Sequence, residues 1–69
     1  MKKINIKFGD KQLSIDENTT LEDFLKNQKI DTRNVATSVN LDLILKDKRK
    51  DKVLKEMDHI NIFGPITGG

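Results

Sequence analysis

The seven residues that end the sequence, FGPITGG, have the clearest potential for chemistry. Gly68 and Gly69 lack side chains, and glycine loses more conformational freedom on ordering than any other residue. Such a segment adds little to a core. Its useful properties are a narrow cross-section and a flexible backbone, and the reactive group that it presents is the main-chain carboxylate. A frayed chain end is the simpler interpretation of the pair, because chain ends are commonly disordered. The pair gains meaning only from the fold that holds it.

Few other residues offer chemistry. The sequence contains no cysteine, which excludes a thiol nucleophile, a disulfide framework and a cysteine-based zinc site. Its single histidine, His59, excludes a cage of several histidines and is a poor candidate for a metal ligand or a general base. Four acidic residues gather near a predicted helix N-terminus, where capping explains them without a metal: Asp16, Glu17, Glu22 and Asp23. We therefore predict no metal site and no cofactor bound by this chain.

The densest run of charge is KDKRKDK, from Lys46 to Lys52. It could bind phosphate or an acidic groove on a partner, but a solvated loop in which Asp47 and Asp51 offset the lysines is the simpler interpretation. The hypothesis that the run binds RNA has less support still, because the sequence has no Tyr or Trp and stacking platforms usually need aromatic side chains. The net charge of +2 is also too balanced for a dedicated nucleic-acid binder. We predict that the chain binds no nucleic acid.

The length of 69 residues suits a single domain. No apolar run approaches the ~20 residues that span a bilayer. The first residues also lack the apolar stretch of a signal peptide. We expect a cytoplasmic protein that does not enter a membrane and that is a monomer when alone.

Short alternating patterns indicate the strands that must hold the last residues in place. Lys3–Phe8 alternates polar and apolar side chains, which puts its apolar residues on one buried face. Gln12–Asp16 alternates again after the turn signal Gly9-Asp10, so we expect a hairpin whose two strands share that face. Apolar and β-branched residues predict three further strands at Val35–Val39, Leu43–Leu45 and His59–Phe63.

A capping box predicts where a helix begins. The hydroxyl of Thr19 could accept a hydrogen bond from a helix amide, and Glu22, three residues later, could return the bond. Acidic residues come early and lysines late in the segment that follows, as the helix dipole favours. We expect a helix from Thr20 to Gln28 with its apolar stripe on the sheet. A shorter helical or 3₁₀ turn is expected to be anchored in the core by Val53, Leu54 and Met57.

One arrangement accounts for every apolar stripe in this order of elements. It is an α+β fold, the β-grasp or ubiquitin-like fold, with a mixed four- to five-stranded sheet packed on one main helix. By analogy with that fold, Lys3–Phe8 and His59–Phe63 lie side by side in the centre of the sheet. Pro65 cannot continue a central strand. We therefore expect residues 1–69 to form one domain, with residues 64–69 as a flexible tail.

The chain resembles the small ubiquitin-like sulfur carriers of the ThiS/MoaD type over nearly its whole length. The shared features are the length, the strand order, Val39-Asn40 at the mid-chain turn, Asp58 before the last strand and the ending Phe63 to Gly69. The length favours the ThiS branch, which feeds thiamin thiazole synthesis. The Phe-x-Pro-x-x-Gly-Gly ending is more similar to MoaD, which feeds molybdopterin synthesis. The ThiS branch is slightly favoured.

This resemblance implies a carrier and not an enzyme. An activating enzyme would use ATP and Mg²⁺ to adenylate the carboxylate of Gly69. Sulfur would then replace AMP, and the thiocarboxylate would donate sulfur to a thiazole synthase or to the large subunit of molybdopterin synthase. The segment that enters the partner's active site would comprise Gly64, Pro65, Ile66, Thr67 and Gly68. Glycine suits such a thread, because a Cβ at residue 68 or 69 would widen it and restrict its dihedral angles.

Two departures from the family pattern stand out. Leu41 and Met57 replace glycines that are usual at two turns, and both are residues that resist a positive φ. Those turns must be built differently, or Asn40 must take the left-handed position. Two other functions stay open: a protein modifier conjugated to lysines through Gly69, and a non-covalent β-grasp binding module that is regulatory or binds RNA.

Overall fold

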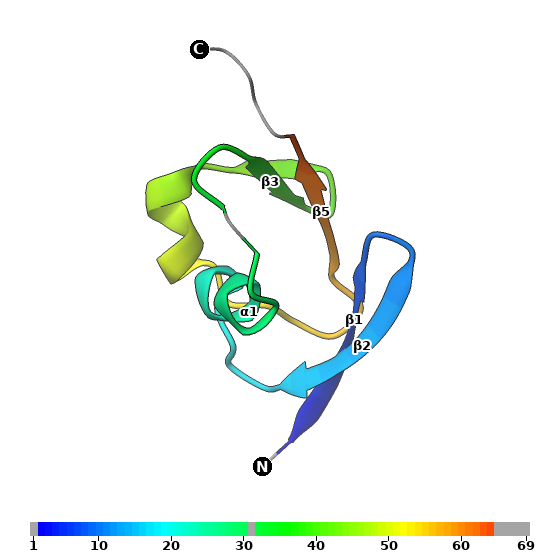
Figure 1. Cartoon of the computed structure of the whole chain (residues 1–69). Helices are drawn as coiled ribbons and strands as arrows, with labels where there is room; N and C mark the ends of the chain where they lie inside the picture. Colours follow the sequence, from blue (N-terminus) through cyan, green and yellow to red (C-terminus); the bar gives the residue numbers. More distant parts are fainter. Residues whose placement is uncertain (1, 31, 65–69) are drawn as a thin grey trace.

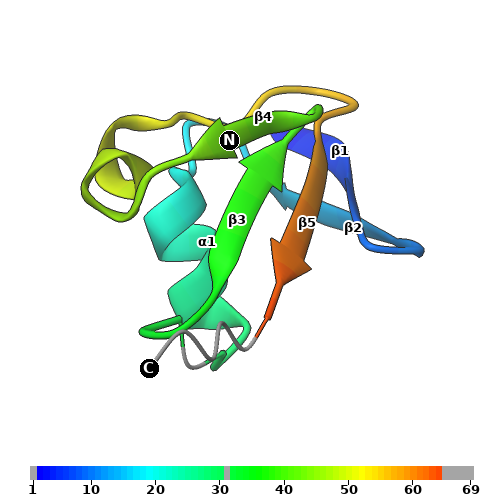
Figure 2. The ribbon, with the colours of Figure 1, turned by 90° about the horizontal axis from the view of Figure 1, so that it is seen from above.

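The computed structural model describes residues 2–30 and 32–64. It contains a five-stranded sheet, one α-helix and one 3₁₀ helix. In chain order the elements are β1 (Lys3–Phe8), β2 (Lys11–Asp16), α1 (Leu21–Asn27), β3 (Ala36–Val39), β4 (Asp42–Ile44), η1 (Lys46–Asp51) and β5 (His59–Phe63). The order of strands in the sheet is β2-β1-β5-β3-β4, and Figures 1 and 2 show the sheet curving around α1. This is the predicted β-grasp arrangement.

The centre of the sheet is formed by the first and last strands, as predicted. β1 and β5 run parallel, with Lys7 opposite His59 and Phe8 opposite Ile60. The hairpin of β1 and β2 and the pairs β3–β5 and β3–β4 are all antiparallel. The predicted strand bounds are right to within one residue. β1 and β5 match at both ends, and β2 begins at Lys11 instead of Gln12. β3 begins at Ala36 instead of Val35, and β4 is shifted one residue toward the N-terminus.

The core lies between the inner face of the sheet and α1. Its buried members come from α1, three strands and the segment after η1: Ile4, Ile6, Leu21, Phe24, Leu25, Val39, Leu54 and Ile60. Phe24 is its largest member, and its ring meets that of Phe8 edge to face, with centroids 5.2 Å apart and planes at 88°. Leu13 and Ile15 share the face of the β1 apolar residues, as predicted, because they stand opposite Ile6 and Ile4.

The cap of α1 differs from the prediction by one residue. Thr20 is the N-cap, and its hydroxyl oxygen accepts a hydrogen bond from the amide of Asp23 at 3.1 Å. The hydroxyl of Thr19 instead donates to the carbonyl oxygen of Asp16 at 2.7 Å. Either threonine satisfies an N-cap preference, so the sequence pattern alone could not choose between them. The choice follows from the turn after β2, which holds Thr19 outside the helix.

The short second helix also lies elsewhere than predicted. The 3₁₀ helix η1 occupies the charge run itself, where we expected a solvated loop, and not the segment around residues 53–57. Leu54 is buried, as expected, but Val53 forms an isolated bridge with Thr20. Met57 was predicted to fill a gap in the core, and this is wrong, because its side chain is 72% exposed.

The turn between β3 and β4 has no glycine, and two residues with side chains adopt the left-handed conformation there. Asn40 and Leu41 both have positive φ, 53° and 75°, between the paired residues Val39 and Asp42. This is the two-residue hairpin geometry that fits the twist of a sheet, and it usually selects glycine at the second position. Asn40 is held by two side-chain hydrogen bonds: its Nδ2 donates to Asp58 Oδ1 at 2.8 Å, and its Oδ1 accepts from the His59 amide at 2.9 Å.

Replacing Leu41 with glycine is expected to stabilise the protein. A left-handed conformation costs about 1–2 kcal/mol for a residue with a Cβ. Glycine removes this cost, but its greater freedom in the unfolded chain lowers the free energy of unfolding by about 0.4–1 kcal/mol. The side chain of Leu41 is 92% exposed, so its removal loses little packing. We expect a net gain of about 1 kcal/mol in the free energy of unfolding, measured as a higher urea midpoint with an unchanged m-value.

Leu43→Gly is the matched control, because Leu43 is also exposed but lies within β4. Glycine there should destabilise the protein, since it adds unfolded-state freedom without relieving a positive φ. A lower urea midpoint for Leu41→Gly would contradict the idea that Leu41 is strained.

Candidate functional site

The last described residues show how the chain leaves the sheet. β5 ends at Phe63, which stands opposite Ala36 of β3. Gly64 follows with a φ of 145°, a conformation that residues with a Cβ rarely adopt, and it is exposed. The rest of the predicted site, Pro65 to Gly69, lies outside the described residues. The structure therefore fixes the root of the tail, and the role of the tail stays a prediction.

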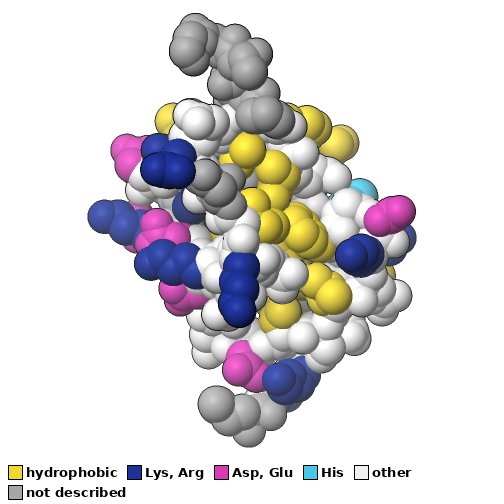
Figure 3. Space-filling view, in the orientation of Figure 1, with side chains coloured by type: hydrophobic (Ala, Val, Ile, Leu, Met, Phe, Trp, Pro, Cys, Tyr) yellow, Lys and Arg dark blue, Asp and Glu magenta, His cyan; other side chains and the backbone are white. Residues whose placement is uncertain are grey.

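An exposed apolar patch adjoins this root. We define the apolar patch as Ala36, Leu43, Leu45 and Phe63. The side chains of Leu43, Leu45 and Phe63 are 63%, 60% and 54% exposed. Ala36 stands opposite Phe63, and it borders the same surface hollow as the two leucines. In Figure 3 some apolar side chains reach the surface at the upper edge of the molecule, where Figure 1 places β3 and β5.

The patch lies on the outer face of the sheet, away from α1. Thr37 and Val39 of β3 and Ile60 of β5 are buried on the inner face, so the residues between them point outward. One of these, Ser38, stands opposite Leu43 and is itself 4% exposed. Its hydroxyl oxygen has no hydrogen-bond partner among the described residues. The outer face where β3, β4 and β5 meet thus carries the apolar patch beside two polar residues, Ser38 and Asn61, which stand opposite each other. Exposed apolar side chains that gather on one face are typical of an interaction site.

Sequence reasoning predicted the strands of this patch but not the patch. Leucine recurs at every second position from 41 to 45, and this period of two was available as a signal. An alternating apolar set normally faces the core. Here β4 is the edge strand, and its core-facing residue is Ile44, which is opposite Thr37 and packs against the core. The alternate leucines are left on the exposed side.

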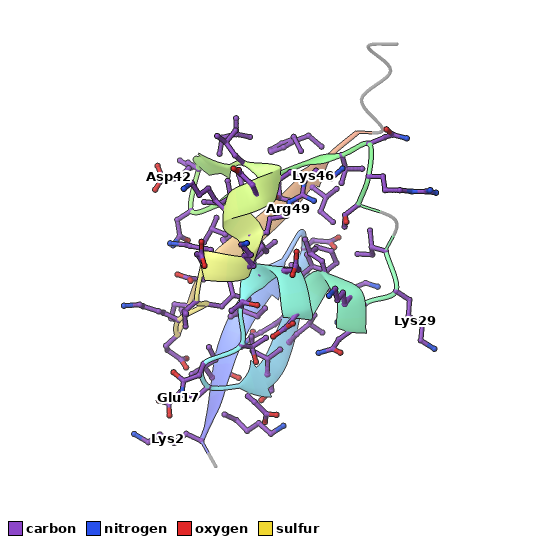
Figure 4. All side chains as sticks on the ribbon, turned by 90° about the vertical axis from the view of Figure 1, so that its left-hand side faces the viewer. Lys2, Glu17, Lys29, Asp42, Lys46 and Arg49 are labelled. Carbon is purple, nitrogen blue, oxygen red and sulfur yellow. The ribbon has the colours of Figure 1, made fainter. Side chains whose placement is uncertain are left out.

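The charge run contains a second unexpected feature, the buried side chain of Arg49. It is only 4% exposed, although the run was predicted to be solvated. Its guanidinium donates three hydrogen bonds: Nε to Thr37 Oγ1 at 3.1 Å, one terminal nitrogen to the Thr32 carbonyl at 3.2 Å, and the other to the Val35 carbonyl at 2.8 Å. Figure 4 shows Arg49 beside Lys46 where η1 meets α1.

The other charged residues of the run are exposed, except the half-buried Lys52, and they are mixed in sign. Figure 3 shows Lys, Arg, Asp and Glu side chains interspersed on the side of the molecule that carries η1. Such a surface lacks the single-sign stripe of a nucleic-acid binder. Within residues 2–30 and 32–64, no three His, Cys, Asp or Glu side chains are grouped so that they could hold a metal ion. No helix in the described part of the chain has the length and apolar character needed to cross a membrane.

His59 has a structural position between two segments of the fold. Its Nε2 lies 2.9 Å from the carbonyl oxygen of Gly9, and its backbone amide donates to Asn40. The side chain therefore joins the β1–β2 turn to the start of β5. That His59 is neither a metal ligand nor a general base stays a prediction.

Comparison with known proteins gives a clear family for this fold and this ending. The sequence profile of the ThiS family matches residues 2–69. The chain belongs to the ThiS family. No curated protein matches the chain in sequence. Among solved structures, the chain is similar to the thiamine biosynthesis protein ThiS from Geobacter metallireducens, with a TM-score of 0.81 and 17% identity over 96% of this chain and 100% of that one.

Membership of the ThiS family confirms the resemblance to sulfur carriers of the ThiS/MoaD type that was inferred from the sequence. ThiS family proteins are small sulfur carriers and not enzymes, which confirms the prediction that this chain is a carrier. The family implies two kinds of partner for a sulfur carrier, an activating enzyme and a sulfur-accepting synthase. The structural match shows the same β-grasp fold.

Proposed function

We propose that the carboxylate of Gly69 receives the sulfur that this ThiS family protein carries. An oxygen of the carboxylate attacks the α-phosphorus of ATP in an activating enzyme that also holds Mg²⁺, and pyrophosphate leaves. A hydrosulfide ion then attacks the acyl carbon of the adenylate, AMP leaves with the bonding electrons, and the proton on sulfur is lost to solvent. The product is a thiocarboxylate on Gly69. A thiazole synthase is the acceptor that we propose for this sulfur.

The position of the tail root is the observation that carries this proposal. The exposed Gly64 follows Phe63 at the end of β5, a strand that β1 and β3 hold on both sides. A carboxylate attached there could enter a partner's site while the domain stays folded outside. The chain would supply the acyl group, and the activating enzyme would supply the groups that stabilise phosphoryl charge. This division also explains how a sulfur carrier can lack cysteine, because the sulfur is carried by the main chain.

Intact mass spectrometry tests the proposal. Protein incubated with its activating enzyme, ATP and a sulfur donor should gain the mass difference between one sulfur and one oxygen. The same mixture without ATP should show no gain. Absence of the shift in the complete mixture would count against the proposal. Covalent adducts between Gly69 and lysines of other proteins would support the protein modifier instead. The cytoplasmic location and the monomeric state stay predictions.

We further propose that the apolar patch docks on the activating enzyme. It adjoins the root of the tail, so one partner surface could hold both. Leu43→Asp would place a charge in the contact and require its desolvation. We expect it to raise the KM for the carrier in the charging reaction by about tenfold or more, as for a central interface residue. The kcat should change little, since the substitution leaves the tail intact.

Met57→Asp is the matched control for the docking prediction. Met57 is also an exposed apolar residue, but it lies in the loop before β5, at the end of that strand opposite the tail. The Met57→Asp variant should be loaded with sulfur with nearly the same KM as the unchanged protein. An equal rise in KM for both variants would show that the effect is not specific to the patch.

A further inference from the structure

Arg49 is a buried cation whose hydrogen bonds go to neutral groups. Its guanidinium donates to two carbonyl oxygens and one hydroxyl. The ion pairs of Lys3 with Asp16 and of Lys26 with Glu22 do not involve Arg49. Burying a charge is costly unless its hydrogen-bonding groups are well matched. The planar fork of the guanidinium, which can reach several acceptors at fixed angles, is the property that this site uses.

All three acceptors surround the start of β3. Thr32 and Val35 precede the strand, and Thr37 is its second residue, so the side chain spans the approach to the strand. Lys46, from the same 3₁₀ helix, adds a weaker contact of 3.4 Å between its Nζ and the carbonyl oxygen of Arg33. One face of η1 therefore holds residues 32–37 in place. This gives the charge run a structural purpose that the sequence did not indicate.

The start of β3 is also the neighbour of the tail root. Ala36 stands opposite Phe63, and Thr37 stands opposite Ile62. Gly64 directly follows Phe63 in the chain. The buried side chain of Arg49 therefore contacts the residues on both sides of Ala36, which pairs with Phe63. It also borders the surface hollow lined by three residues of the apolar patch, Ala36, Leu43 and Leu45.

We propose that Arg49 is a positioning residue for sulfur loading. It fixes residues 32–37, these residues fix Phe63 and the apolar patch, and the tail therefore leaves the sheet from a constant place and direction. This inference rests on the proposed function, because it concerns the delivery of Gly69 to the activating enzyme. Arg49 itself touches no reacting atom in this scheme.

Arg49→Lys tests the inference while keeping the charge. Lysine cannot reproduce the fork, so the start of β3 should become less ordered, and docking must then restore that order. We expect the KM for the carrier in charging to rise about fivefold, with kcat within about twofold of the unchanged protein, since ordering costs at interfaces act on affinity. Lys48→Met, an exposed position on the same 3₁₀ helix, is the matched control and should leave both constants unchanged.

Nuclear magnetic resonance of the free variant gives a second measurement that needs no partner. In Arg49→Lys the backbone amide signals of Ala36, Phe63 and Gly64 should shift or broaden, while those of the β1–β2 hairpin should stay in place. Unchanged signals at these three residues, or an unchanged KM in a variant that is folded at the assay temperature, would overturn the inference. Failure of the unchanged protein to gain sulfur would instead overturn the proposed function.

Discussion

Deleting Gly69 is expected to abolish sulfur loading. The shortened chain still ends in a glycine carboxylate, but that group falls short of its former position by about 3.5 Å, the reach of one residue. A displacement of about 1 Å at a reacting group can reduce a rate about 100-fold, so loading should fall at least that far. Intact mass spectrometry of the loading reaction, with time points, measures the loss directly.

The deletion is informative because its effect on the fold is expected to be negligible. The core and all five strands lie within residues 3–63. The thermal unfolding midpoint should therefore equal that of the complete chain, and docking through the apolar patch should persist. Gly69→Ala keeps the length of the tail but adds one Cβ, so it should slow loading less than the deletion does. Loading of the deletion variant at the full rate would show that Gly69 is not the site of sulfur attachment.

Replacing Phe24 with alanine should have the largest effect on stability. Phe24 is 1% exposed, it comes from the middle of α1, and its ring contacts that of Phe8 edge to face. Truncating a buried phenylalanine costs about 3–5 kcal/mol through lost burial and the cavity left behind. The total stability of a domain of this size is only about 3–10 kcal/mol. We expect Phe24→Ala to be largely unfolded, as measured by circular dichroism and urea titration.

Two further substitutions make this result quantitative. Phe24→Leu keeps most of the apolar volume, and its loss of stability should be small enough to measure by urea titration of a folded protein. Phe63→Ala is the matched control, because the same residue type there is 54% exposed. It should change the free energy of unfolding by less than about 1 kcal/mol. Similar losses for Phe24→Ala and Phe63→Ala would contradict the assignment of the core.

The two exposed residues at positive φ show what the family pattern can and cannot predict. Leu41 and Met57 were identified from the sequence as replacements for glycine, and both adopt the left-handed conformation that glycine favours, with φ of 75° and 71°. Of the two alternatives predicted for these turns, the left-handed Asn40 is found, with φ of 53°. The other alternative, that the turns are built differently because Leu41 and Met57 resist a positive φ, is wrong. The backbone at Leu41 and Met57 thus keeps the conformation that glycine would adopt. The Cβ of each residue makes that conformation less favourable. Asn40 donates a hydrogen bond to Asp58 and accepts one from the His59 amide, and these two hydrogen bonds offset part of the cost of its positive φ.

The sequence by itself determined the class of fold, the family and the residue that we propose as the site of chemistry. Period-two and helical patterns are local, so Lys3–Phe8 and His59–Phe63 could be predicted with their bounds. Only the tertiary structure decided which side chains are exposed. Leu43 and Leu45 are exposed because β4 is an edge strand, and no described element packs on its outer face. Arg49 is buried because folding brings it to acceptors 12 to 17 positions away in the chain. Contacts between distant residues depend on how the elements pack, and no local pattern of charge or hydrophobicity contains that information.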